Sequence, residues 1–259
     1  MKQVIVGGCA VMVAVGIVFG IALAVWLPPA VQYMQYGYAD LPSFIERRIA
    51  TFDGHEVSFL VSKFDSDNAR WALMNDPSSP RSVHEWRETS GAQFVINGSY
   101  FTETYQPSGF YAIENGSSMV PWPEADASGY TFGVNVNDDG RMHLLYLPQE
   151  ASATPPEGST LLSFPTLVVD DVSMIKADSG LHARRTVLAQ TDDGTTYGIV
   201  SESGEASLYQ MAQWLAAQPE HFRIAGNIDG GPSTGLSAPS SPWDIEIHSA
   251  AVPNVIVVR

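Results

Sequence analysis

Two Asp-Gly pairs, each placed between two runs of alternating apolar and polar residues, constrain the fold more than any other feature. Asp139-Gly140 lies within YTFGVNVNDDGRMHLLYL, and Asp193-Gly194 lies within TVLAQTDDGTTYGIVS. Alternation with a period of two is typical of strands, and Asp-Gly favours the tight turn of a β-hairpin. A calcium loop is the alternative for these acidic turns, but neither run has the ligand spacing of an EF-hand. The sequence therefore predicts antiparallel hairpins closed by ordinary turns.

Two other segments carry the signals of short α-helices. Ser82 and Ser207 are followed three residues later by Glu85 and Gln210, which is the spacing of a capping box. After the second cap, apolar residues recur at helical spacing, at positions 208, 211, 212 and 215. We expect this apolar stripe to pack against a sheet.

Residues 4–27 form an apolar run of 24 residues without a charged side chain. As a helix this run would extend about 36 Å, which is enough to cross a hydrocarbon core about 30 Å thick. It is predicted to be a transmembrane anchor, and a cleaved signal peptide is the alternative because Ala22-Leu23-Ala24 has the form of a cleavage site. Lys2 is the only charge before the run and favours a cytoplasmic N-terminus, with the remaining chain outside.

The predicted organisation has three parts. Residues 1–27 are the anchor or signal segment, residues 28–50 a stalk or linker, and residues 51–259 a single folded domain. Strand-like runs dominate that domain, so we predict an α+β fold with one hairpin-rich, mostly antiparallel mixed sheet and a few helices.

Charge and cysteine content restrict the possible partners. Cys9 is the only cysteine and lies within the apolar run, so the exported part can form no disulfide and no thiolate metal site. Without Lys2 the chain has 12 basic and 28 acidic residues, a formal charge of −16. This charge argues against nucleic acid as a partner, and an anionic substrate would need a local basic site.

Two apolar runs stop abruptly at Asn and Gly: FVINGSYF at residues 94–101 and FRIAGNIDGG at residues 222–231. An ordinary turn explains either run alone. Taken together, they predict two strand ends that open at one edge of the same sheet. Arg184-Arg185 adds a small basic group beside a predicted strand, which is either a solvated strand edge or a two-pronged grip for an anion.

Six segments, in order along the chain, resemble the phosphodiester glycosidase family. FVINGSYF is similar to the Asn-Gly-Gly-Phe-Phe strand end of that family, and QPSGFYAIENG to its xPxGLxxxxG run. LLSFPTLVVDD resembles QSGPxLVxxG, and RTVLAQTDDGTTYGIVS resembles RTAIGxxxDGxxxxxxV. The capped helix SLYQMAQWL and the strand end GNIDGGPST, which is similar to NLDGGGSS, complete the series. The resemblance thus extends over most of the exported domain.

The resemblance implies a catalytic set of Asp229, Arg185, Asn97 and Asn227. In this reading the Asp229 carboxylate stabilises or attacks an oxocarbenium-like sugar, or activates water, while Arg185 holds the phosphate and the two asparagines position groups by hydrogen bonds. The substrate-binding residues that accompany this set are Gly98, Ser99, Gly230, Gly231, Ser233, Thr234 and Glu114. A second carboxylate is expected, with Glu114 and Glu103 left as alternatives.

Three departures from the family pattern bear on substrate preference. Ser99 replaces the second glycine of the first motif, and Pro232 replaces the third glycine of the last, which removes one backbone N–H donor. In SFPTL only Ser163 and Pro165 remain of the Gln-Ser-Gly-Pro lettering.

The function implied by the resemblance is that of an exported, membrane-anchored hydrolase. It would cleave a sugar from a sugar phosphodiester at the anomeric carbon, in envelope or extracellular glycans, with its catalytic domain on the periplasmic or extracellular face. No cofactor and no metal are expected. Two alternatives stay open, a non-catalytic envelope protein that binds anionic glycans and a metal-dependent phosphodiesterase.

Overall fold

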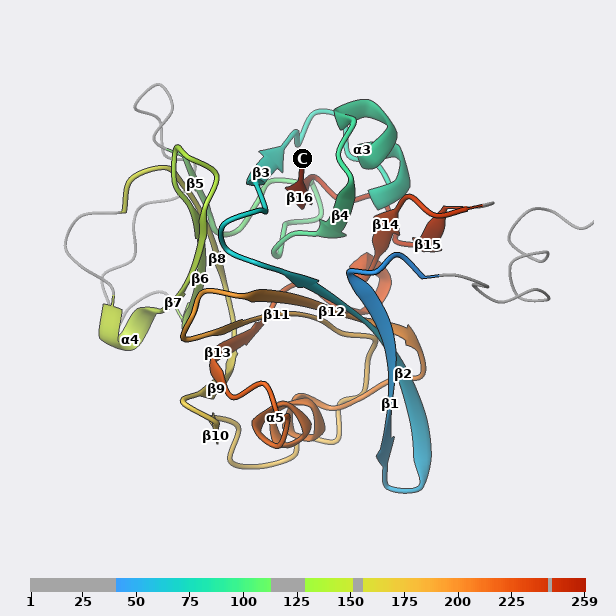
Figure 1. The fold of residues 1–259 in the computed structure, drawn as a ribbon, viewed down its shortest axis with the longest axis vertical. Coiled ribbons are helices and arrows are strands. Elements are labelled where there is room, and N and C mark those ends of the chain that lie inside the picture. The colour runs from blue at the N-terminus through green and yellow to red at the C-terminus, as the bar shows by residue number, and fades with distance from the viewer. Residues whose placement is uncertain (1–40, 113–128, 151–155, 242–243) are drawn as a thin grey trace, which may run out of the picture. The chain divides into compact units, whose positions relative to one another are not determined.

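The computed structural model describes residues 41–112, 129–150, 156–241 and 244–259. These residues form three β-sheets with a few short helices (Figure 1). The strand pairings within them are antiparallel. The prediction of a mostly antiparallel, helix-poor fold is confirmed, but the single mixed sheet is corrected to three antiparallel ones. Hairpin signals specify which neighbouring strands pair, and they carry no information about which hairpins join into one sheet.

The largest sheet has seven strands. In spatial order they are β1 (Ile45–Phe52), β2 (His55–Phe64), β12 (Thr196–Ser203), β11 (Thr186–Thr191), β13 (Phe222–Asn227), β9 (Thr166–Val169) and β10 (Val172–Ser173). The hairpin of β11 and β12 is the one predicted around Asp193-Gly194. The Asp193 carboxylate accepts hydrogen bonds from the Thr191 hydroxyl and the Thr195 amide. This aspartate therefore stabilises the turn in which it lies.

The strand β1 begins inside the segment that the sequence assigned to a stalk, residues 28–50. Ile45 and Ala50 are buried, and the Arg47 guanidinium forms a two-pronged ion pair with Glu202 on β12. The end of that segment is therefore part of the seven-stranded sheet, in which β1 pairs with β2. It adds buried apolar side chains and an ion pair to the sheet.

Helix α5 (Leu208–Ala216) covers one face of the seven-stranded sheet (Figure 1). Ser207 and Gln210 form the predicted capping box at its start. Met211, Ala212 and Leu215 are fully buried in one apolar cluster with residues of β2, β9, β11, β12 and β13. The predicted apolar stripe is thus confirmed as core.

The second sheet has five strands and carries helix α3 (Val83–Ser90). Its strands, in spatial order, are β15 (Ile245–Ile247), β14 (Leu236–Ala238), β4 (Phe94–Asn97), β16 (Asn254–Val258) and β3 (Trp71–Asn75). Ser82 and Glu85 form the predicted capping box of α3, and Gly91 ends the helix in a left-handed conformation. Val83 and Trp86 pack into an apolar cluster with valines of β4 and β16.

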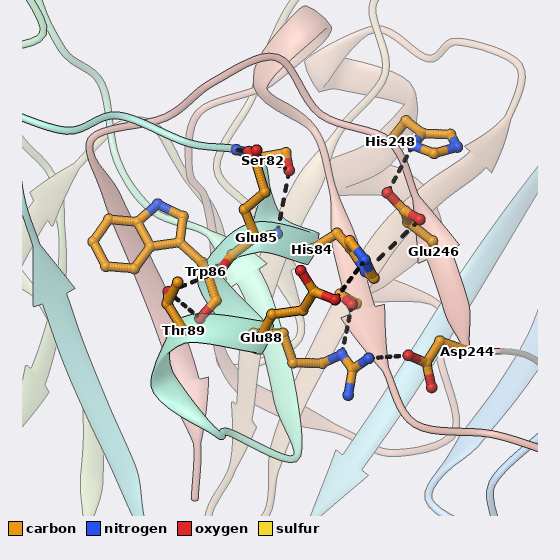
Figure 2. Close-up of polar contacts among 11 residues, drawn as sticks. Ser82, His84, Glu85, Trp86, Glu88, Thr89, Asp244, Glu246 and His248 are labelled. Atoms are coloured by element: carbon orange, nitrogen blue, oxygen red, sulfur yellow. Dashed lines mark hydrogen bonds and ion pairs between the residues drawn. The ribbon is translucent and has the colours of Figure 1, made fainter.

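Polar contacts fix α3 to the edge of the five-stranded sheet (Figure 2). Arg87 donates a hydrogen bond to the Ser237 hydroxyl at 2.9 Å and forms an ion pair with Asp244. Glu246 on β15 lies 3.9 Å from His84 Nδ1 on α3 and 2.7 Å from His248 Nδ1 (Figure 2). The contacts of Arg87 and His84 hold β14, β15 and the residue before β15 close to the helix.

The third sheet contains β5 (Phe110–Ala112), β8 (Ser159–Ser163), β6 (Phe132–Val136) and β7 (Met142–Tyr146), in that spatial order. The predicted hairpin around Asp139-Gly140 is its β6–β7 pair, which leads into the short helix α4 (Leu147–Glu150). Phe132 of β6 is fully buried and packs closely against Gly226 of β13, where a Cβ atom would lie 2.2 Å from the Phe132 ring. This contact joins the third sheet to the first.

The two strand ends singled out in the sequence belong to different sheets. β4 ends at Asn97 in the five-stranded sheet, whereas β13 ends at Asn227 in the seven-stranded sheet. The expectation that both would open at one edge of the same sheet is therefore wrong, although their ends do meet, as described below.

In the described part of the chain, none of the helices has the length and apolar character needed to cross a membrane. The apolar run of residues 4–27 lies outside the described residues.

Replacing Gly226 with alanine is expected to lower the free energy of unfolding by about 1–3 kcal/mol, because the added methyl group would overlap the buried Phe132 ring. Ile49→Ala, at an exposed position on β1, is the control and should change it by less than about 0.5 kcal/mol. Urea unfolding of both variants measures the difference, and equal stability of the two would contradict the tight packing between the sheets.

Candidate active site

The ends of β4 and β13 are joined through the backbone of Asp229. The Asp229 amide donates to the Gly98 carbonyl oxygen at 3.2 Å, and the Asp229 carbonyl oxygen accepts from Asn97 Nδ2 at 2.7 Å. Asp229 follows the fully buried Ile228, so its backbone cannot shift without disturbing the core. The predicted pairing of the two motifs is thus made by hydrogen bonds between sheets.

Asn97 is fully buried, and both ends of its amide are occupied. Besides Asp229, Asn97 Nδ2 donates to the Gly98 carbonyl oxygen at 3.2 Å. Asn97 Oδ1 accepts from the Thr186 hydroxyl at 2.7 Å and from the Gly235 amide at 3.1 Å. The side chain therefore binds β11, the Asp229 loop and the chain before β14, and it acts by holding these segments in place.

Gly98 and Ser99 shape the turn after β4. A Cβ atom on Gly98 would lie 1.9 Å from Asn254 Oδ1, so only glycine fits there. The Ser99 amide donates to that same oxygen at 2.7 Å, and the Ser99 hydroxyl donates to the Leu162 carbonyl oxygen at 2.5 Å. Ser99 is only 3% exposed, so the structure places its hydroxyl in a contact between the turn and β8.

Tyr100, which the sequence analysis did not single out, lies over Asn227. Asn227 is 1% exposed, and its Nδ2 donates to the Tyr100 hydroxyl at 2.8 Å and to the Ile228 carbonyl oxygen at 2.6 Å. The Tyr100 hydroxyl donates to the Phe164 carbonyl oxygen at 3.1 Å. The position directly after Asn-Gly-Ser was the available signal, but the sequence could not show that its hydroxyl turns towards Asn227.

The Tyr100 hydroxyl lies in the field of two opposite charges. Burial, together with the negative charge of Asp229, raises the pKa of Tyr100 to about 12, while Arg185 and the hydrogen bond from Asn227 oppose the change. The phenol is therefore neutral at neutral pH and keeps its proton. A Cβ atom on Gly230, which directly follows Asp229, would lie 4.0 Å from Arg185 Cδ. Asp229 and Arg185, predicted from separate motifs, therefore lie in the same small region.

The Asp229 carboxyl group is half-buried at the start of the last glycine motif. Its Oδ1 accepts a hydrogen bond from the Gly230 amide at 2.9 Å. Burial raises the pKa of this carboxyl group, and hydrogen bonds from the Ser233 side chain and the Gly230 amide oppose that effect. A carboxylate in such surroundings carries a charge that is poorly solvated, which favours interaction with a positive centre.

The backbone amides of the glycine motif are directed inward. The Gly231 amide donates to the Arg184 carbonyl oxygen at 2.9 Å, while those of Ser233 and Thr234 donate to Gly230 and Gly231, each at 3.2 Å. The last two of these bonds form the 3-10 turn η2 (Gly231–Ser233), which has Pro232 at its second position. This loop therefore does not present successive free amides to a phosphate, so an anion would have to be bound by side chains.

Arg185 is suited to that task. Its Nε and Nη2 donate to the carbonyl oxygens of Ala206 and Leu181, both at 2.9 Å, and within the described ranges no carboxylate forms an ion pair with it. Burial lowers the pKa of Arg185, while Tyr100 and Glu205 raise it. The guanidinium is thus held in place by neutral groups, which leave its charge for a ligand.

Arg184 points to other groups. Its Nη2 donates to the Thr234 carbonyl oxygen at 2.9 Å and its Nη1 to the His248 carbonyl oxygen at 3.3 Å. It therefore braces the segment that follows η2. The two neighbouring arginines therefore have different partners, and the assignment of Arg185 to the site stays a prediction.

The remaining expected residues are only partly placed. Glu114 lies outside the described residues, and Glu103 is exposed in the turn after β4. Within the described ranges, no group of three or more His, Cys, Asp or Glu residues is arranged to hold a metal ion.

A cavity of about 830 Å³ lies away from this site, beside β3 and the β6–β7 turn. It is lined among others by Arg70, Asp139 and Arg259. None of the predicted site residues lines it. The charged and hydrogen-bonded groups that suit a sugar phosphodiester therefore lie outside this cavity.

Comparison with solved structures shows the same fold in other organisms. The catalytic domain of zebrafish N-acetylglucosamine-1-phosphodiester alpha-N-acetylglucosaminidase, auto-inhibited by its pro-peptide, has a TM-score of 0.60 and 15% sequence identity, with 85% of this chain and 84% of that chain covered. A hypothetical protein from Synechocystis has a TM-score of 0.59 and 13% identity, and the match covers 83% of this chain but 61% of that one. At these identities the likeness concerns the fold alone.

Sequence comparison defines the family. No curated protein matches the chain. The family model described as phosphodiester glycosidase, however, matches residues 90–259, which is more than half of the chain and includes both strand ends and the Arg185 region. The chain therefore belongs to the phosphodiester glycosidase family.

Proposed function

We propose that this protein hydrolyses the bond between the anomeric carbon of a sugar and the oxygen of a phosphodiester. The observation that carries the proposal is that the half-buried Asp229 carboxylate lies near Arg185, whose guanidinium forms no ion pair with a carboxylate of the described residues. A carboxylate suits the positive charge that develops on the sugar, and a guanidinium suits a phosphate. Membership of the family supports the same reaction class.

In the proposed reaction the bond from the anomeric carbon to the phosphate oxygen breaks, and the oxygen of water bonds to that carbon. The products are a free sugar and a phosphate monoester, and the proton released by water goes to solvent or to the phosphate. Because the leaving phosphate is already a stable anion, protonation by a general acid contributes less than in ordinary glycoside hydrolysis. Stabilisation of the phosphate by Arg185 contributes correspondingly more.

The other predicted residues act mainly by positioning these two groups. Asn97 holds the backbone of Asp229, and Asn227 holds Tyr100. Ser233 directs a hydrogen bond at the Asp229 carboxyl group. The remaining residues, which set the turns that carry these groups, are Gly98, Ser99, Gly230, Gly231 and Thr234. A second carboxylate, for which Glu114 is a candidate, would complete the acid–base pair.

The proposed location is the outer face of a membrane. The apolar run of residues 4–27 would anchor the chain, and Lys2 would keep the N-terminus in the cytoplasm. A sugar phosphodiester of envelope or extracellular glycans is the proposed substrate class. An acidic protein with a formal charge of −15 needs the local charge of Arg185 to attract such an anion.

The identity of the released product tests this function. The full-length chain, purified in detergent, is incubated with methyl phosphodiesters of sugar 1-phosphates, and the products are separated by chromatography. Free sugar with methyl phosphate supports the proposal. Sugar phosphate with methanol, formed in a reaction that a chelator stops, identifies a metal-dependent phosphodiesterase, and binding without any product identifies a glycan-binding protein.

Arg185→Ala is expected to lower kcat/KM for the sugar phosphodiester about 100-fold or more, because one charge-stabilising donor is removed from the transition state. Arg184→Ala is the matched control, and its effect should be clearly smaller because Arg184 donates to carbonyl oxygens of the protein. Steady-state kinetics and the melting temperatures of both variants are measured together. Equal losses of kcat/KM in two equally stable variants would contradict the assignment.

The acid limb of the pH–rate profile should belong to Asp229. Its carboxyl group must be ionised to act on the sugar, and burial raises its pKa. The rate should therefore fall with acid at a pH above the value of about 3.9 that is usual for aspartate. Asp229→Asn should remove this limb together with most of the activity. A limb at the usual aspartate value would speak against the role given to Asp229.

Asp229 is also expected to reduce stability at neutral pH. Because its pKa is higher in the folded than in the unfolded state, the folded state binds the proton more readily, and ionisation above that pKa weakens folding. Asp229→Asn should thus be more stable than the natural protein at pH 7, and the gain should shrink as the pH falls through the pKa of Asp229. Melting temperatures across pH 3–8 measure this, and a lower melting temperature of the variant at pH 7 would refute it.

A further inference from the structure

Phe164 is an aromatic residue left open to solvent directly beside the site. Its side chain is 43% exposed, which makes it one of the few large apolar residues of this kind in the described ranges. It lies in the turn between β8 and β9, and the Phe164 carbonyl oxygen accepts hydrogen bonds from the Tyr100 hydroxyl at 3.1 Å and from Asn227 Nδ2 at 3.3 Å. The turn is thus fixed to two residues of the site.

The ring of Phe164 is held in one orientation by stacking. Its centroid lies 4.6 Å from that of Tyr100, with an angle of 19° between the ring planes. The Tyr130 ring is 6.1 Å away and tilted by 54°, so it supports the edge of the stack. Since Tyr100 covers one face, the exposed area of Phe164 is at the other face and the edges. An ordered aromatic face is therefore presented to solvent.

We propose that the exposed face of Phe164 is the platform on which the sugar ring of the substrate stacks. This inference rests on the proposed function and adds the residue that recognises the sugar. A pyranose has an apolar face made of C–H groups, and such faces pack on aromatic rings, which supply a large apolar area at small cost in side-chain entropy. The remaining hydroxyl groups of the sugar stay free for water and for polar neighbours.

The sugar fits this platform better than the group on the other side of the phosphate. The Phe164 carbonyl oxygen accepts a hydrogen bond from Asn227, which lies two residues before Asp229, so the Phe164 turn is fixed beside the Asp229 strand end. Asp229 must approach the anomeric carbon, which belongs to the sugar, so the ring next to the Asp229 side of the site is the sugar itself. Arg185, bound to the carbonyl oxygens of Ala206 and Leu181, then meets the phosphate.

Binding of three probes tests the platform without turnover: glucose 1-phosphate, N-acetylglucosamine 1-phosphate and inorganic phosphate. The full-length chain in detergent is compared with Phe164→Ala, Phe164→Tyr and the control Val172→Ala, which removes an exposed apolar side chain on β10. Phe164→Ala should weaken binding of at least one sugar phosphate about five- to tenfold and change phosphate binding less than twofold. Phe164→Tyr should retain the affinity, and Val172→Ala should leave it unchanged.

Saturation-transfer NMR gives a second readout on the same samples. Irradiation of the aromatic protons of the protein should saturate ring protons of the bound sugar phosphate, and Phe164→Ala should lose most of that transfer. The proposal is overturned if Phe164→Ala binds both sugar phosphates as tightly as the natural protein, if it loses phosphate binding equally, or if neither sugar phosphate binds better than inorganic phosphate. Phe164-dependent binding without cleavage of a phosphodiester would refute only the proposed function. Cleavage with Phe164-independent binding would refute only the platform.

Discussion

The backbone hydrogen bonds between the ends of β4 and β13 are the interaction on which the rest of the site depends. They join two sheets at Asp229, whose amide reaches Gly98 and whose carbonyl oxygen is held by Asn97. Asn97 itself is buried and fully bonded, so it cannot relax without leaving buried polar groups unpaired, which is costly. The Asp229 carboxyl group is thereby carried on a rigid support rather than on a free loop.

The site separates charges that would otherwise neutralise one another. In a protein with 28 acidic residues and 13 basic ones, an exposed arginine would readily find a carboxylate. Arg185 is instead bonded to the carbonyl oxygens of Ala206 and Leu181, and it forms no ion pair with a carboxylate of the described residues. Its charge therefore stays available for a negative phosphate, while that of Asp229 stays available for a positive centre.

Local signals in the sequence predicted the local structure well. Capping boxes at Ser82 and Ser207 and the two Asp-Gly turns lie where expected, because each depends on residues a few positions apart. The assembly of the sheets was not predictable, since β4 and β13 have similar sequences at their ends but pair with different strands.

The chemistry of the site divides in the same way. Asp229 and Arg185 could be assigned from motifs, whereas the inward direction of the Gly231 and Ser233 amides depends on the contact with Arg184 and on the turn η2. Phe164 and Tyr100 come from segments that are 64 residues apart, and only the folded chain stacks their rings. The positions of aromatic residues in the sequence do not predict such a stacked pair, because most aromatic side chains are buried in the core.

Hydrolysis in water labelled with ¹⁸O tests the central claim most directly, since it shows which bond breaks. If Asp229 and Arg185 serve attack at the anomeric carbon, the label enters the sugar, and mass spectrometry of the phosphate monoester, whose oxygens do not exchange with water, finds none of it. Label in the phosphate monoester would mean that water attacks phosphorus, and that result would contradict the account.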